Sequence, residues 1–155
     1  MVITIRDVVL NILPGFKFTS NKSEAAVAFK DADKIAAWEI YIELVTRISL
    51  EPLLDDEGDE ETALNSLYTL FQNMRASIGK HGPKAVESAR IGIFVLNKVL
   101  RPFLARWHKI VSDKNFDDVK KAEFRKELSV LQKSLKGYAD SLLKLIGIDG
   151  DMELL

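Results

Sequence analysis

Apolar residues recur at alternating steps of three and four along most of this chain, which is the spacing of one side of an α-helix. The first such segment runs from about Asp31 or Asp33, either of which can serve as the N-cap, to Ile48. Its apolar stripe consists of Ile35, Trp38, Ile42, Val45 and Ile48. Because Glu39 and Glu43 lie on the other side of this helix, we expect the stripe to face the core.

Two further segments show the same pattern. One follows Asp59, a good N-cap, and ends in the turn from Gly79 to Pro83. Its stripe is Leu64, Leu67, Phe71, Met74 and Ile78. The other begins near Asp117 or Asp118 and ends at Gly147. Its stripe is Phe124, Leu128, Leu131, Leu135, Tyr138, Leu142 and Leu145.

The segment between these two is the longest. Its stripe is Val86, Ala89, Ile93, Leu96, Leu100, Phe103, Trp107 and Ile110. More apolar residues lie off that stripe, so this third helix is either central to the bundle or part of an interface between copies. Pro102 lies inside the helix and has no backbone N–H to donate, which predicts a kink between Lys98 and Arg101.

Four amphipathic helices with short connections indicate an all-α fold, an antiparallel bundle of about four long helices. We expect residues 1–155 to form a single domain, with residues 1–30 as a short N-terminal extension. In this extension Val2–Ile5 can form a short strand and Val8–Leu13 one or two helical turns. The pattern leaves open whether the extension packs on its own bundle or on that of a neighbour.

Composition and charge narrow the classes of function. The chain has no cysteine, which excludes disulfides and thiolate chemistry, and its sparse histidines favour neither a metal site nor a cofactor. No apolar stretch is long enough for a bilayer and no signal peptide is recognisable, so we expect a cytoplasmic protein with no membrane partner. Residues 30–61 carry a net charge of −8 and residues 84–136 one of +7. Acidic and basic helices packed as neighbours would explain this, as would head-to-tail pairing of copies or a basic face for nucleic acid.

The most pointed polar feature is a ridge along one side of the third helix, with spacings of seven, four and seven residues. Its members are Arg90, Asn97, Arg101 and His108. Such groups reach solvent, bond to another helix or hold a ligand. One interpretation is a solvated edge with one salt bridge, for which Glu39 or Glu43 would supply the carboxylate. The other is a binding site; His81, in a turn, is expected to be exposed and outside it.

The string from Arg101 to His108 also resembles the Arg-x4–6-His signature of HEPN proteins, which are small helical bundles that often dimerise and, when active, cut RNA. The resemblance implies that Arg101 would stabilise the phosphate charge and His108 would act as acid or base on the ribose hydroxyl, where two copies meet. Longer strings around Trp38, Arg101 and Trp107 are similar to small uncharacterised bacterial helical proteins. That similarity implies a bacterial source and no particular activity.

We therefore expect a non-enzymatic helical-bundle interaction protein, an adaptor, regulator or small subunit of a bacterial complex, in a defence or stress setting. Its partner would be another protein or a second copy of itself, bound through the third helix. The alternative is a HEPN-like RNase or nucleotide-binding protein with Arg101 and His108 as catalytic residues. Nucleic-acid binding by the basic fourth helix is a third interpretation. Trp38 and Trp107 are expected to anchor the core or an interface.

Overall fold

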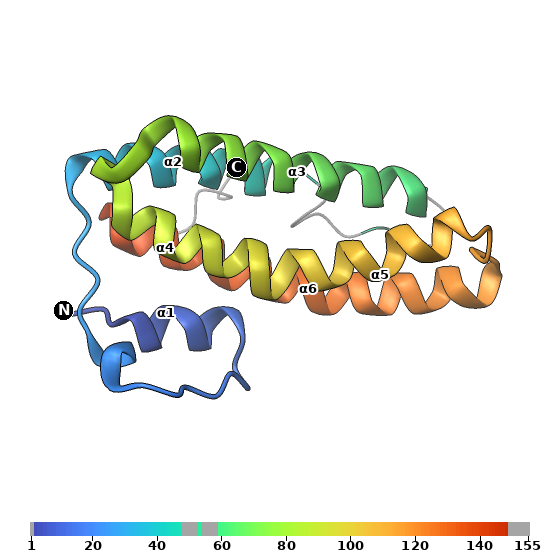
Figure 1. The fold of residues 1–155 in the computed structure, drawn as a ribbon, viewed down its shortest axis with the longest axis horizontal. Coiled ribbons are helices and arrows are strands. Elements are labelled where there is room, and N and C mark those ends of the chain that lie inside the picture. The colour runs from blue at the N-terminus through green and yellow to red at the C-terminus, as the bar shows by residue number, and fades with distance from the viewer. Residues whose placement is uncertain (1, 48–52, 54–58, 149–155) are drawn as a thin grey trace.

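The structure is a computed structural model that describes residues 2–47, 53 and 59–148. Over these residues the protein is an all-α, antiparallel helical bundle, as the pattern predicted (Figure 1). Three of its rods are the helices α2 (Asp31–Val45), α3 (Glu60–His81) and α6 (Asp118–Ile146). The fourth rod is the third helix of the sequence. The predicted helix end at Ile48 and the chain after Ile148 lie outside the described residues.

Most helix ends lie where the capping residues predicted them. The Asp59 side chain accepts a hydrogen bond at the start of α3, and the Asp117 side chain does the same for α6. Gly147 ends α6 with a φ of 95°, the left-handed conformation that favours glycine. At the start of α2 the cap differs, because Lys30 is the N-cap residue and the Asp33 carboxylate accepts its backbone N–H at 2.9 Å.

The fourth rod, here called the α4–α5 rod, contains a π-helical turn in front of Pro102. It begins with the 3₁₀ turn η2 (Gly82–Ala85) and continues through α4 (Val86–Val95), the π-turn η3 (Leu96–Leu100) and α5 (Arg101–Ser112). The Arg101 N–H donates to the Leu96 carbonyl, five residues back. The wide turn in front of Pro102 does not break the rod, and α4 and α5 run on as one continuous rod (Figure 1), since π-turns absorb an irregularity without ending a helix.

The α4–α5 rod buries one side of its length in the bundle. Its buried residues recur every four positions: Ile91 and Gly92, Val95 and Leu96, Val99 and Leu100, Phe103 and Leu104, then Trp107. A spacing of four residues is longer than the 3.6 residues of one α-helical turn. The π-turn, which holds more residues per turn, accounts for part of this difference in spacing. Of its large apolar side chains, Val86 and Ile93 are exposed.

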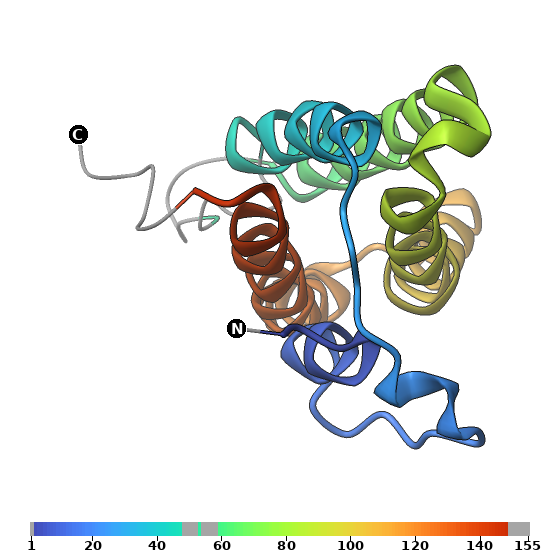
Figure 2. The same cartoon turned by 90° about the vertical axis from the view of Figure 1, so that its left-hand side faces the viewer.

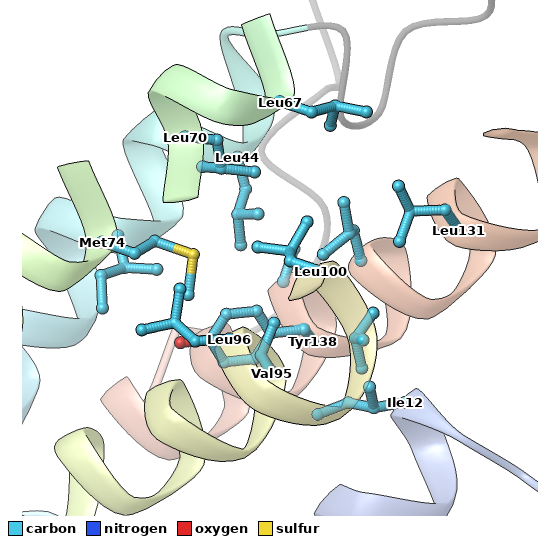
Figure 3. Close-up of a cluster of buried hydrophobic side chains, with 14 of the residues drawn as sticks. Ile12, Leu44, Leu67, Leu70, Met74, Val95, Leu96, Leu100, Leu131 and Tyr138 are labelled. Atoms are coloured by element: carbon cyan, nitrogen blue, oxygen red, sulfur yellow. The ribbon is translucent and has the colours of Figure 1, made fainter. Parts of the chain in front are cut away.

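The core is drawn from every rod. Figure 3 shows Leu96 and Leu100 of the α4–α5 rod gathered with Met74 of α3 and Tyr138 of α6. All seven residues of the stripe predicted for α6 are buried. Trp107 is fully buried among aromatic rings: Phe103, Phe116 and Phe124.

The predicted orientation of α2 is wrong. Ile35, Trp38 and Ile42 of the expected core stripe are 62%, 37% and 40% exposed. The helix instead buries a second stripe against α6 and α3, formed by Ala36, Ala37, Ile40, Tyr41 and Leu44. Because α2 is apolar on both sides, periodicity alone did not distinguish them, and the stripe with two alanines allows the closer approach to the neighbouring helices.

The N-terminal extension packs on its own bundle. Helix α1 (Ile5–Ile12) lies against α6, on the far side of the bundle from α2 and α3 (Figure 2). The Thr4 side chain caps α1, and the suggested strand is reduced to one antiparallel bridge between Thr4 and Ala26. The short 3₁₀ turn η1 (Asn21–Glu24) lies between these parts. In the part of the chain that is described, no helix is long and apolar enough to cross a membrane.

Candidate functional site

Arg101 and Asn97 are brought together on the exposed side of the α4–α5 rod. The Arg101 guanidinium donates to Asn97 Oδ1 at 3.2 Å and lies 5.5 Å from the centre of the Phe71 ring on α3. Both Arg101 and Asn97 are exposed. Within residues 2–47, 53 and 59–148 no carboxylate pairs with this guanidinium, so its charge is braced by an amide and an aromatic face and faces solvent.

His108 is further along the same rod and is also exposed. Its ring centre lies 6.1 Å from that of Tyr68 on α3. Seven residues separate it from Arg101, which is about 10 Å along a helix axis at 1.5 Å per residue. In the described part of the chain no contact joins these two predicted site residues.

Arg90 leaves the predicted ridge altogether. It forms an ion pair with Glu87 of the same helix, Nη1 to Oε1, at 3.1 Å, and it lines a hollow between α4 and α1. The π-turn between Arg90 and Arg101 holds more residues than an α-turn, so the side of the rod before the turn does not continue in register after it. The predicted ridge of four is therefore a pair, a separate histidine and a separate arginine.

The carboxylate of Glu39 faces α3. Its Oε2 lies 2.5 Å from His81 Nε2, and it also accepts hydrogen bonds of 3.1 Å from Lys80 Nζ and Ser77 Oγ. Hydrogen bonds from His81 and Lys80, in that order of effect, lower the pKa of Glu39 from its ordinary 4.5 to about 2. The expectation that His81 is exposed is wrong, since it ends α3 half-buried against α2.

Glu43 completes a polar clasp between α2 and α3. Its carboxylate accepts hydrogen bonds from Asn73 Nδ2 at 3.2 Å and from Arg47 Nε at 2.5 Å. The clasp borders a cavity of about 210 Å³ between the two helices. Glu39 and Glu43 therefore bond to α3 and to Arg47 just after α2, not to the arginines of the α4–α5 rod, because the true orientation of α2 turns them that way. This corrects the expected salt bridge.

The remaining candidate surface is the exposed apolar stripe of α2, here called the outer stripe and defined as Ile35, Trp38 and Ile42. The Trp38 ring stacks on Tyr41 at 5.7 Å between centres, which holds it against the helix. Half-buried Val45 continues the stripe, so the spacing is three, four and three. The apolar spacing identified these residues but placed them in the core. The second apolar stripe on the same helix is the feature of the sequence that could have indicated the opposite orientation.

No family model, curated protein or solved structure matches this chain. Among the described residues, no three histidine, aspartate or glutamate side chains gather where they would hold a metal ion. The arrangement thus offers three features for function: the outer stripe, the exposed arginine and histidine of α5, and the hollow beside Arg90.

Proposed function

We propose that this protein is a helical-bundle interaction protein, an adaptor or small subunit of a larger assembly, and that the outer stripe of α2 is its docking surface. One observation carries the proposal. Three large apolar side chains stand exposed in a row on a helix whose opposite side already fills the core. Clustered exposed apolar side chains of this kind characterise interaction sites on soluble proteins.

The spacing of the outer stripe suits a helix as the partner. Positions three, four and three residues apart form the a and d seam of a coiled coil, in which side chains of one helix insert between those of another. Full burial of a large apolar side chain stabilises by about 1.5 to 3 kcal/mol. A facing helix would remove Ile35, Trp38 and Ile42 from water together.

We propose that the partner bound at the outer stripe is a second copy of this chain. A second α2 presents the same apolar seam, so the contact is self-complementary about a two-fold axis. The rim beside Trp38 carries the Glu39 and Lys80 pair, whose opposite charges lie 3.1 Å apart. Two copies would therefore meet with both signs of charge at the rim and without a net repulsion.

The dimer is expected to be weak. Helix α2 has 15 residues, which corresponds to about 22 Å of length. So short a strip falls below the roughly 800 Å² per partner of a stable interface. We expect a dissociation constant in the micromolar range.

The test is size-exclusion chromatography with multi-angle light scattering, from low to high micromolar protein. The wild type should move from monomer to dimer over this range, and Ile42→Lys should stay monomeric. Ile93→Lys is the matched control, because Ile93 is equally apolar and exposed but lies on α4. A wild type that stays monomeric throughout, or an Ile42→Lys variant that dimerises normally, would reject the proposal. Loss of the dimer in Ile93→Lys alone would move the interface to the third helix.

A second candidate function is the HEPN-like RNase. What supports it is that Arg101 has no carboxylate partner in the described chain, while exposed His108 shares its helix and lies beside Tyr68. Guanidinium, imidazole and aromatic faces are the groups that bind and cleave single-stranded RNA.

Mixed RNA should be incubated with the wild type, His108→Ala and Arg101→Ala. The matched control is Arg106→Ala, since Arg106 lies on the same helix but is paired with Glu123 and Glu127. Cleavage by the wild type and Arg106→Ala, and by neither of the other variants, is the expected result for an RNase. Equal cleavage by all four proteins, or none, eliminates this function.

A further inference from the structure

Between α1 and α4 lies an apolar hollow of about 230 Å³. Three of its lining side chains are buried: Val8, Val9 and Ile91. Three more are apolar and half-buried: Ile5, Val27 and Phe94. The ring of Phe16 packs on that of Phe94, edge to face with centres 5.3 Å apart. The hollow is therefore formed before any ligand arrives.

Two charged residues line this otherwise apolar hollow. They are Glu87 and Arg90, one helical turn apart on α4, with Oε1 and Nη1 separated by 3.1 Å. Arg90 is exposed and Glu87 half-buried, and a surface ion pair of this kind contributes about 1 kcal/mol or less, so a ligand can separate the two groups at little cost. The hollow thus offers an apolar chamber with a carboxylate and a guanidinium side by side at its edge.

We propose that this hollow binds a free apolar α-amino acid. The α-carboxylate of such a ligand would accept hydrogen bonds from Arg90, its ammonium group would donate to Glu87, and its side chain would occupy the apolar chamber. One ion pair is exchanged for two, and no charge is left without a partner. The adjacent charges of a zwitterion match the adjacent charges of the pair.

Other simple ligands fit these groups less well. A carboxylate without an ammonium group would bond to Arg90 but repel Glu87, and an amine would have the reverse conflict. A polar side chain would enter a chamber with no apparent partner among its lining residues, which is costly. For size, an apolar cavity of about 150 Å³ accommodates benzene, so the side chain of leucine or isoleucine fits here.

The experiment is a calorimetric or NMR titration of the full chain with L-leucine. Three further compounds each lack one feature of leucine. 4-Methylpentanoate lacks the ammonium group, 3-methylbutylamine lacks the carboxylate and glycine lacks the apolar side chain. Leucine should bind in the millimolar range or tighter, and each probe about tenfold more weakly, the equivalent of about 1.4 kcal/mol. Absence of leucine binding at millimolar concentration, or glycine binding equal to that of leucine, would overturn the proposal.

Two variants test the residues. Arg90→Gln and Glu87→Gln should each weaken leucine binding about tenfold, while the control Arg75→Gln, at an exposed arginine of α3, should leave it unchanged. Both Arg90 and Glu87 lie on the surface of α4, and circular dichroism checks that each variant is folded. Unchanged leucine affinity in Arg90→Gln would also overturn the proposal. None of these changes touches the outer stripe of α2, so the result is independent of the dimer.

Discussion

The backbone oxygen of Asn11 occupies the place where a side chain on Gly137 would begin: a Cβ atom built on Gly137 would lie only 1.9 Å from it. The Asn11 side-chain amide in turn donates to the Gly137 carbonyl and to Ser141 Oγ, each at 3.0 Å. Glycine permits this approach of α1 to α6 because it has no Cβ. The N-terminal extension, and with it the hollow beside Arg90, is therefore positioned by one glycine of α6.

Replacing that glycine should loosen α1. In Gly137→Ala the new methyl group meets backbone rather than a flexible side chain, so α1 must shift, and we expect a loss of about 1 to 3 kcal/mol in the free energy of unfolding. Gly79→Ala is the control, because nothing lies within 4 Å of its added Cβ in α3. It should stabilise by about 0.5 to 1 kcal/mol. Urea denaturation measures both, and a Gly137→Ala protein as stable as the wild type would contradict the packing.

Asp33 should be the most costly carboxylate to remove at the start of α2. It is buried, and its two oxygens accept the backbone N–H groups of Lys30 and Ser88 at 2.9 and 3.0 Å, which joins the starts of α2 and α4. Asp33→Ala leaves the Ser88 N–H without an acceptor and should cost about 1 to 3 kcal/mol. Asp31→Ala, in the same helical turn but exposed, should cost less than about 1 kcal/mol. Equal losses in the two variants by urea denaturation would be the contrary result.

Glu39 should make the protein less stable in acid. Its pKa is lowered in the folded state from 4.5 to about 2, so its stabilising effect is complete above pH 4.5 and is lost as the pH falls toward 2. Because the side chain is 41% exposed, we expect the effect to stay below about 1 kcal/mol. The stability difference between wild type and Glu39→Gln should therefore shrink within that window. Carboxyl NMR titration checks the pKa directly, and an ordinary value for Glu39 would contradict the clasp.

The two tryptophans should give distinguishable fluorescence signals. Trp107 is fully buried among three phenylalanines, whereas Trp38 is 37% exposed. The Trp38→Phe variant should emit at short wavelength and resist acrylamide, because only the core ring remains. The wild type should show an additional quenchable component, which diminishes with concentration if α2 pairs with a second copy. Strong quenching of Trp38→Phe would contradict the burial of Trp107.

Parts of the candidate site were predictable from spacing. Asn97 and Arg101 meet because residues four apart face each other on a helix, a relation that extends only one turn. The separation of Arg90 from them was not predictable, since it depends on the π-turn. The hydrogen-bond partners of Glu39 on α3 were also not predictable from the sequence, because Glu39 and Lys80 are 41 positions apart along the chain.

What the sequence by itself determined is local: the helices, their caps at Asp59, Asp117 and Gly147, and one buried stripe of α6. Each of these depends on groups that lie within a few residues of one another in the sequence. Only the tertiary structure decided which side of α2 is exposed and where α1 rests. The reason is that a helix apolar on both sides satisfies either orientation, and the choice falls to how closely distant helices can approach.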